Sequence, residues 1–286
     1  MLSGIPIPKD AIRPPETVLV NITPQETRVA VLEENNICEL HIERNSGHSL
    51  VGNIYLGVVR RVLPGMQSAF IDIGLERAAF LHIVDVLEQR RNPDETQRIE
   101  HMLFEGQSVL VQVIKDPINT KGARLSTQIS LAGRFLVHLP QEDHIGISQR
   151  IEDDAERNSL RERLTNLLPE DACHGYIIRT NAENATDEQL QSDIHYLTKV
   201  WEHIQEQAKI QPPETLLYQD LPLSLRVLRD MFSLDTQKIL VDSTENHRRM
   251  TRFAEQYVHG ALGRIELFKG ERPLFETHNV EQEISR

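Results

Sequence analysis

Hydrophobic and polar residues alternate along much of the first half of the chain, which is the period of a β-strand with one buried face. Three short strands are predicted at 17–21, 28–32 and 37–42, and longer β-rich runs at 53–64, 68–73, 77–82 and 107–114. Pro64 and Gly65 predict a turn between the first two longer runs. Gly122 predicts a further tight turn near the end of this region. The longer runs together predict a small β-barrel, with the polar segment 89–97 as a loop or short helix within it.

The pattern changes after about residue 130, where strand and helix signals alternate. Strands are predicted at 134–139 and 175–180, with a helix from about 154 to 168 between them. A longer helix follows, because Thr186 and Gln189 form a capping-box signature. One stripe of apolar residues recurs along it at helical spacing: Leu190, Ile194, Leu197, Trp201 and Ile204. Trp201 is therefore predicted to be a core residue.

The segment 211–214 contains two prolines and marks a boundary. Beyond it, helices are predicted at 223–232 and 244–258, flanking a strand at 238–242, with a last strand at 265–268. The predicted fold class is therefore α+β with more than one domain, which a chain of 286 residues is long enough to form.

Charge is distributed unevenly along the chain, whose formal net charge is -12. Residues 50–130 carry nine Lys and Arg against nine Asp and Glu, whereas residues 131–215 carry eight against sixteen. The negative net charge argues against a nucleic-acid protein that depends on overall basicity. The predicted barrel is neutral, and the excess of acidic residues lies elsewhere in the chain.

Cys38 and Cys173 lie far apart and form no CxxC pair, so the sequence predicts neither a disulfide framework nor a zinc site. Two reduced, buried thiols are expected instead. The first 16 residues are Pro-rich and predict a mobile leader rather than a signal peptide. Because no apolar run is long enough to span a bilayer, we expect a cytoplasmic protein without a membrane partner.

Two aromatic residues, Phe70 and Phe80, lie on predicted strands of the barrel. Bases of single-stranded nucleic acid stack on exposed aromatic rings, so this placement is typical of a single-strand platform. Burial in the core is the alternative, because apolar residues are mostly buried. Lys121 and Arg124 lie beside the last barrel strand, where cations would hold phosphates, although a solvated loop lysine is the common case.

The run from Val51 to His82 resembles the S1 RNA-binding domain of the ribonuclease E/G family over an ungapped stretch. The resemblance extends over nearly the whole chain after about residue 16, through the segments 23–30, 113–125, 146–152, 177–180, 226–230 and 280–285. It implies an S1 or OB-fold barrel at 50–128 and a 5′-sensor domain at 129–215. Both would be inserted into an RNase H-like subdomain formed by 17–49 and 216–286.

The resemblance also implies roles for particular residues. Phe70, Phe80 and Lys121 fall on positions where the family's S1 domain contacts RNA, and Arg124 lies beside them. Leu56 departs from the family, which commonly has a basic residue there, so a backbone contact is expected to be missing and binding weaker.

A second site is implied at Arg179 and Thr180, because an Arg-Thr pair at this position holds the 5′-monophosphate of RNA in the family. A guanidinium fork and a neighbouring hydroxyl suit phosphate oxygens. The family's pocket also uses the segment matching Gly133 to Val137, where main-chain N–H groups face the phosphate. Without the resemblance, a surface ion pair is the simpler interpretation of Arg179.

Catalysis in the family needs magnesium held by aspartates of a DNase I-like domain, which the resemblance places after the end of this sequence. No cofactor is therefore expected in this chain, and magnesium only in a full-length enzyme. Five aspartates are candidates by type, but their spacing defines no metal site: Asp72, Asp220, Asp230, Asp235 and Asp242. Capping and solvation explain several of them. Neither a GxSxG motif nor a Gly-rich phosphate loop is found.

The sequence therefore favours a chain that binds single-stranded RNA, preferably 5′-monophosphorylated, without cutting it on its own. Two alternatives stay open. One is an active magnesium-dependent endoribonuclease, if the natural chain continues or other acids carry out the chemistry. The other is an interaction remnant that has lost RNA binding, which Leu56 and the acidic middle favour. The family's enzymes are oligomers, so a homo-oligomer and a monomer are both open.

Overall fold

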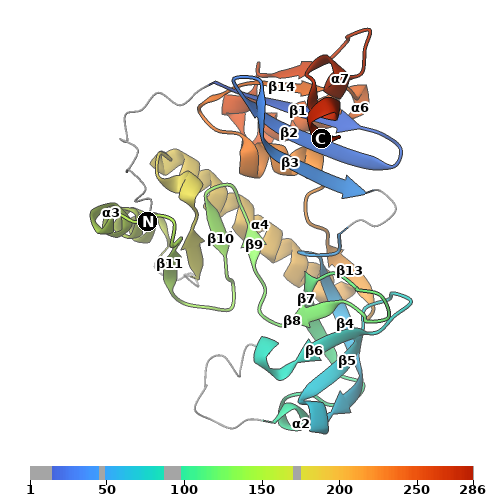
Figure 1. Ribbon diagram of the computed structural model, residues 1–286. Coiled ribbons are helices and arrows are strands. Elements are labelled where there is room, and N and C mark those ends of the chain that lie inside the picture. The colour runs from blue at the N-terminus through green and yellow to red at the C-terminus, as the bar shows by residue number, and fades with distance from the viewer. Residues whose placement is uncertain (1–14, 45–48, 87–97, 170–174, 286) are drawn as a thin grey trace, which may run out of the picture. The chain divides into compact units, whose positions relative to one another are not determined.

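The structure is a computed structural model that describes residues 15–44, 49–86, 98–169 and 175–285. The chain forms two compact units, one made of residues 1–48 and 221–286 and the other of residues 49–220. The first unit contains one sheet and the second contains two, and each unit has its own core residues (Figure 1). The predicted leader lies mostly outside the described residues, as do the segment 89–97 and Cys173.

The first unit is built on a five-stranded sheet with the order β15-β14-β1-β2-β3. Its strands are β1 (Glu16–Ile22), β2 (Glu26–Glu33), β3 (Asn36–Arg44), β14 (Thr236–Val241) and β15 (Ile265–Leu267). The first three form an antiparallel meander, while β14 and β15 are parallel to β1. The three strands predicted at the start of the chain are confirmed, as are those predicted at 238–242 and 265–268.

Both faces of this sheet are covered, which explains why β1 and β14 are apolar on both sides. One face packs on α5 (Leu223–Arg226), a π-helical turn (Val227–Met231) and α6 (Thr244–Tyr257). The other face packs on α7 (Leu274–Thr277) and α8 (Val280–Ile284). The helix predicted at 223–232 thus exists, but its second half has π-helical hydrogen bonding.

The second unit contains a closed β-barrel of five strands. They are β4 (Ile54–Leu63), β5 (Ser68–Asp72), β6 (Ala79–His82), β7 (Ser108–Lys115) and β8 (Arg124–Ser126). The order β4-β5-β6-β8-β7 closes because β4 also pairs with β7, and β13 (Thr215–Tyr218) adds to β4 outside the ring. A short helix, α2 (Ile99–Met102), precedes β7. The predicted barrel is confirmed, and its small apolar interior is consistent with an OB-like fold.

The rest of this unit is a four-stranded sheet with two helices. The strands are β9 (Leu131–Ala132), β10 (Leu136–His138), β11 (Ile145–Ile147) and β12 (Tyr176–Ile178), in the order β11-β12-β10-β9. They pack on α3 (Asp154–Leu167) and α4 (Asp187–Ile210). The predicted capping box at Thr186 and Gln189 is present. Trp201 is half-buried against the core, so the predicted apolar stripe is confirmed.

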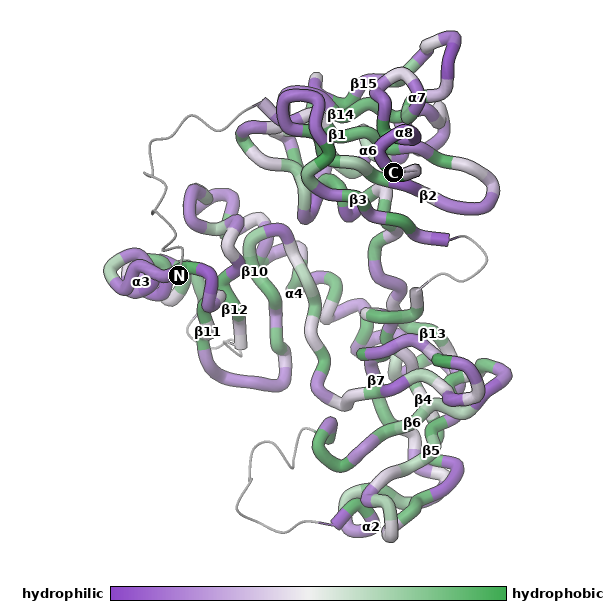
Figure 2. The backbone as a smooth tube through the Cα atoms, in the orientation of Figure 1, coloured by the Kyte–Doolittle hydropathy of each residue, from purple (hydrophilic) through white to green (hydrophobic). Residues whose placement is uncertain are grey.

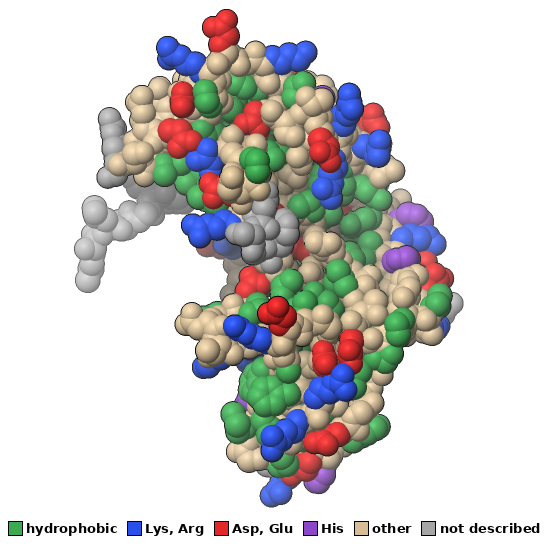
Figure 3. All heavy atoms as spheres, turned by 90° about the vertical axis from the view of Figure 1, so that its right-hand side faces the viewer, with side chains coloured by type: hydrophobic (Ala, Val, Ile, Leu, Met, Phe, Trp, Pro, Cys, Tyr) green, Lys and Arg blue, Asp and Glu red, His purple; other side chains and the backbone are tan. Residues whose placement is uncertain are grey.

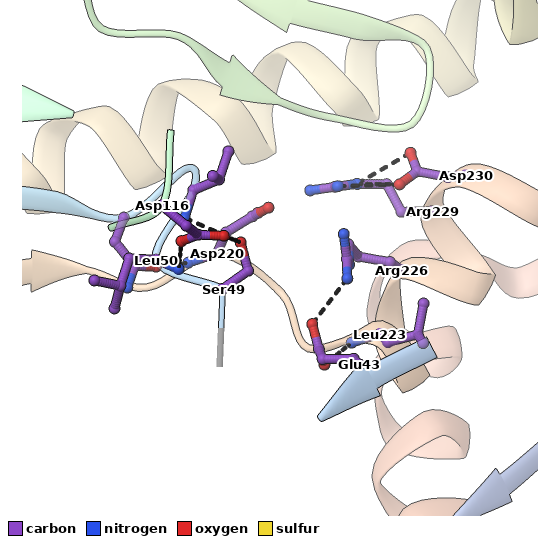
Figure 4. Close-up of polar contacts among 11 residues, drawn as sticks. Glu43, Ser49, Leu50, Asp116, Asp220, Leu223, Arg226, Arg229 and Asp230 are labelled. Atoms are coloured by element: carbon purple, nitrogen blue, oxygen red, sulfur yellow. Dashed lines mark hydrogen bonds and ion pairs between the residues drawn. The ribbon is translucent and has the colours of Figure 1, made fainter. Parts of the chain in front are cut away.

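The chain passes from one unit to the other twice, and carboxylates fix the chain near these crossings (Figure 4). In the first unit, Glu43 accepts hydrogen bonds from Leu223 N (2.9 Å) and from the guanidinium of Arg226 (2.8 Å). In the second, Asp116 accepts from Ser49 Oγ at 2.8 Å and from Leu50 N at 2.6 Å. Each unit therefore holds its own chain ends together.

One expectation from the sequence is wrong. Cys38 is exposed on the edge strand β3, rather than buried, because β3 has a neighbour on one side only. A tight turn is present near the end of the barrel, but it is formed by Asn119, which has a positive φ, and Thr120, rather than by Gly122. Glycine is needed at position 122 because a Cβ there would lie 2.0 Å from the carbonyl oxygen of Ala78. Hydrophobic and hydrophilic stretches alternate along the strands of both units, as the sequence predicts (Figure 2).

Candidate nucleic-acid interface

Phe70 and Phe80 lie on the outer surface of the barrel, because side chains alternate between the two faces of a strand. Ala69 and Ile71 of β5 are fully buried in the barrel interior, so Phe70 between them points outward and is 36% exposed. Phe80 of β6 is half-buried. The two rings are cross-strand partners with centroids 6.3 Å apart and an interplanar angle of 65°. The alternative of two core phenylalanines is therefore wrong.

The strand register extends this pair into a row across the barrel. Arg61 of β4 pairs with Phe70, and Arg124 of β8 pairs with Phe80. Lys115 of β7 pairs in turn with Arg124. Because directly paired residues lie on the same face of a sheet, the order on the surface is Arg61, Phe70, Phe80, Arg124, Lys115. We call these five residues the barrel row. Sequence reasoning missed Arg61 and Lys115.

A buried carboxylate holds one cation of the barrel row in place. Arg124 Nε donates to Asp85 Oδ2 at 2.8 Å, and the Asp85 side chain is only 4% exposed. Asp85 is itself fixed, because its carbonyl oxygen accepts from Ser126 Oγ and from Thr127 N. An ion pair with one buried member restrains the long arginine side chain beside Phe80.

Lys121 lies in the hairpin that precedes β8. Its backbone exchanges two hydrogen bonds with Ile118, at 3.1 and 2.9 Å, and its side chain is exposed. Lysine and arginine side chains are interspersed with acidic ones on the face drawn in Figure 3. Positive and negative charges are therefore mixed on the face that is drawn.

Leu56 lies on β4 between Leu110 of β7 and Thr215 of β13. It is half-buried and packs with Leu110 against the core formed with α4. The residue that departs from the family pattern therefore contributes to packing between the barrel and the rest of its unit.

Arg179 and Thr180 follow strand β12, and the structure brings Arg179 together with Gly133. The guanidinium donates from Nη1 to the carbonyl oxygen of Gly133 at 2.5 Å, and Arg179 N donates to Phe135 O at 2.8 Å. Thr180 is half-buried and begins a 3₁₀ turn. Val137 lies on β10 between Ala132 and Ile177 of the neighbouring strands.

A further residue at this site, Asp193 of α4, was missed from the sequence. Its carboxylate accepts from Arg134 N (3.0 Å), Phe135 N (2.8 Å) and Leu136 N (2.8 Å). These main-chain donors face a carboxylate of the protein itself. Burial raises the pKa of Asp193, although the three hydrogen bonds and the charge of Arg179 oppose the shift. A Cβ on Gly133 would lie 2.5 Å from Asp193 Oδ2, so this position needs glycine.

A signal for Asp193 exists in the sequence. It lies three residues after Leu190, inside the apolar stripe of the helix, where a carboxylate is out of place. A buried charge at such a position needs partners, and the turn 133–136 supplies them.

The candidate acids have structural roles where their contacts are known. Asp72 pairs with Arg60 at 3.0 Å, and Asp242 accepts from Asn21 and from Ile22 N. Asp230 pairs with the buried Arg229. Within the described ranges, no cluster of three or more His, Cys, Asp or Glu residues could hold a metal ion. None of the described helices is long and apolar enough to cross a membrane.

These features define a class: a mixed α+β protein that carries a closed five-stranded barrel of the OB-like kind with aromatic residues on its outer surface. The family follows from sequence comparison, since the sequence model of the ribonuclease E/G family matches residues 130–286. The chain belongs to this family, which confirms the resemblance seen in the sequence.

Individual relatives agree with this assignment. Ribonuclease G of Salmonella typhimurium (strain SL1344) is 42% identical over 276 residues, which cover 94% of this chain and 56% of that protein. Ribonuclease G of Escherichia coli (strain K12) is 41% identical with the same coverage. Ribonuclease E of Nostoc sp. (strain PCC 7120) is 39% identical over 240 residues, or 84% of this chain and 34% of that protein. The chain thus spans about half the length of the ribonuclease G relatives.

Proposed function

We propose that this chain binds single-stranded RNA on the barrel row and recognises a 5′-monophosphate at Arg179 and Thr180, without cutting RNA on its own. Family membership supports RNA as the ligand. The observation that carries the proposal is the barrel row itself, in which two aromatic rings in edge-to-face contact are flanked by cations on both sides. The domain division implied by the resemblance is part of this proposal.

The central part of the barrel row suits a strand of RNA. Neighbouring strands of a sheet lie about 4.8 Å apart, so Phe70 and Phe80 lie on adjacent strands with a cation on the next strand to either side, while the complete row curves around the closed barrel. A base that stacks on an aromatic ring gains about 1–3 kcal/mol, and the arginine and lysine side chains supply the phosphate contacts. Affinity would then come from two stacking positions plus a few charges, in a segment with no net charge.

The barrel proposal is tested with Phe80→Ala and fluorescence anisotropy of a short single-stranded RNA. Loss of one stacking contact of about 1–3 kcal/mol should weaken binding roughly 5- to 150-fold, whatever the 5′ end carries. Phe104→Ala is the matched control, because Phe104 is 67% exposed in the same unit and lies outside the barrel row. Equal effects of the two substitutions would disprove the role of the barrel row.

The 5′-end proposal rests on Arg179, whose guanidinium is already oriented by Gly133, and on the neighbouring hydroxyl of Thr180. Thr180→Val removes one donor while keeping the shape of the side chain. It should remove the preference for 5′-monophosphate over 5′-hydroxyl RNA and leave hydroxyl RNA unaffected. Thr165→Val, at an exposed position of α3, is the control. Equal losses on both RNAs would show that Thr180 is no sensor.

Cleavage is a separate question, because the similar proteins are named ribonuclease G and ribonuclease E. We expect residues 1–286 alone to bind RNA without cutting it. Hydrolysis would need magnesium-binding aspartates that these residues do not provide. The second candidate, an active endoribonuclease, is favoured by those names. Magnesium-dependent cleavage by the purified 286-residue chain would support it and overturn our expectation.

Two further points of the proposal concern partners. The third candidate, an interaction remnant, is favoured by Leu56, which packs where the family commonly has a basic residue. Co-purification with a protein partner, together with no binding to either RNA, would support it. A homo-oligomer is the other partner considered, and sedimentation of the chain with and without RNA would establish the oligomeric state.

A further inference from the structure

Helix α6 of the first unit has exposed arginines on one face and packs against the core with the other. Met250 and Ala254 are fully buried against the sheet, which fixes the rotation of the helix. Arg248, Arg249 and Arg252 are exposed on the opposite side. Residues three and four apart on a helix are neighbours, so the three guanidinium groups share one surface about one turn long.

These arginines differ from several arginines of the same unit that are held in ion pairs. Arg28 pairs with Glu281 at 2.7 Å, and Arg229 pairs with Asp230 at 3.0 Å. Among the described residues, no ion pair within 4 Å joins the three arginines of α6 to an acidic side chain, although Glu245 and Glu255 lie on the same helix. Glu245 lies three and four residues before Arg248 and Arg249, and Glu255 lies three residues after Arg252, so this exposed face carries three cations and two acids. In a chain of net charge -12, a face with a positive balance favours an anionic ligand.

An aromatic pair borders this face. Phe253 and Tyr257 are four residues apart on α6, their ring centroids are 5.0 Å apart at 54°, and Tyr257 is 41% exposed. Arg249 lies four residues before Phe253 on the same side of the helix. A ligand that carries both phosphates and planar rings matches this combination better than an acidic peptide, which offers carboxylates only.

We propose that Arg248, Arg249 and Arg252, bordered by Phe253 and Tyr257, form a second RNA-binding surface that takes the phosphates of a single-stranded segment. This arginine face lies in the first unit, whereas the barrel row lies in the second. The proposed arginine face therefore goes beyond the function proposed above and is tested independently of it. The apolar side of α6 is in the core, which excludes insertion of this helix into a membrane.

The test compares two triple substitutions that change the charge equally. Arg248→Gln, Arg249→Gln and Arg252→Gln remove the arginine face. The control combines Arg44→Gln, Lys269→Gln and Arg272→Gln, which remove exposed cations of the same unit that lie outside α6. Anisotropy with a long unstructured RNA is measured across about 50–200 mM salt, and thermal unfolding confirms that both variants fold.

Three phosphate contacts on a single strand contribute about 2 to the slope of log affinity against log salt, since each adds about 0.7. We expect the arginine-face variant to lose about that much slope and to bind RNA roughly 10- to 100-fold more weakly at 0.1 M salt. The control should change the slope by less than about 0.5. The same difference should persist when Phe80→Ala has disabled the barrel row, which separates this inference from the function proposed above.

Two results would overturn the inference. Equal losses in the two triple variants would mean that only total charge matters. Unchanged RNA binding by the arginine-face variant, together with lost binding of a polyglutamate peptide, would make the face a protein-docking site. As a second support, a photoreactive RNA should crosslink to the peptide that contains Phe253 and Tyr257, and this crosslink should disappear in the arginine-face variant.

Discussion

Removal of the Asp193 carboxylate tests the geometry of the proposed 5′-end site most directly. Asp193 accepts three main-chain hydrogen bonds from the turn 133–136, at 3.0, 2.8 and 2.8 Å. Phe135 and Leu136, which provide two of these donors, are buried. Asp193→Ala therefore leaves two buried N–H groups without their acceptor, while Arg134, which is half-buried, has better access to water.

The magnitude follows from opposing contributions. A buried donor without an acceptor costs about 1–3 kcal/mol, so two of them cost about 2–6 kcal/mol. Against this, the variant no longer buries a carboxylate, whose desolvation is large enough to raise its pKa. We expect a net loss of about 2–4 kcal/mol in the free energy of unfolding. For a domain of 150–250 residues this lowers Tm by about 4–16 °C.

The assay is thermal unfolding combined with RNA binding. Glu202→Gln, at an exposed position of the same helix, is the control and should change stability by less than about 0.5 kcal/mol. The turn also carries the carbonyl oxygen of Gly133 that orients Arg179, so Asp193→Ala should weaken the preference for 5′-monophosphate RNA. Unchanged Tm and unchanged preference would refute the reasoning. Gly133→Ala, which pushes a Cβ toward Asp193, should lower the same preference if Asp193→Ala fails to fold.

Three other predictions concern the second unit. Burial lowers the pKa of His138 in the folded state below its unfolded-state value of 6.5. The contribution of neutral His138 to stability is therefore complete above pH 6.5 and is lost as pH falls through the folded-state pKa. His138→Gln should flatten the dependence of the free energy of unfolding on pH below 6.5. Gly122→Ala should cost about 1–3 kcal/mol by urea unfolding because of the backbone of Ala78, whereas Gly65→Ala, with open space around it, should be neutral. Arg61→Gln should lower the slope of log affinity for RNA against log salt by about 0.7, and an unchanged slope would remove Arg61 from the interface.

Local patterns in the sequence were sufficient to predict the longer elements. The apolar stripe and capping box of α4 are local features, and both are present in the structure. The short strand β13 was not predicted, because its strand character depends on pairing with β4, where Thr215 lies beside Leu56. Four residues carry too little periodicity to indicate a strand when the partner is far away in the chain.

The barrel row shows why the candidate site was predicted only in part. Simple alternation from Val59, which is buried, would place Arg61 inside the barrel as well. A register shift between these two residues turns Arg61 to the outer surface beside Phe70. The shift between Val113 and Lys115 has the same effect on β7. A slip of one residue exchanges the faces of a strand, so residue types alone could not place these cations.

The two proposed RNA surfaces both combine stacking with phosphate contacts. The barrel row pairs two aromatic rings with three cations, Arg61, Arg124 and Lys115. The arginine face of α6 offers three cations bordered by Phe253 and Tyr257. Each phosphate contact on a single strand adds about 0.7 to the salt slope, so both surfaces should bind RNA less tightly as salt increases, and their contributions are separated by substituting each surface in turn. An overall charge of -12 is therefore compatible with RNA binding, since stacking requires no net positive charge and the cations of α6 act locally.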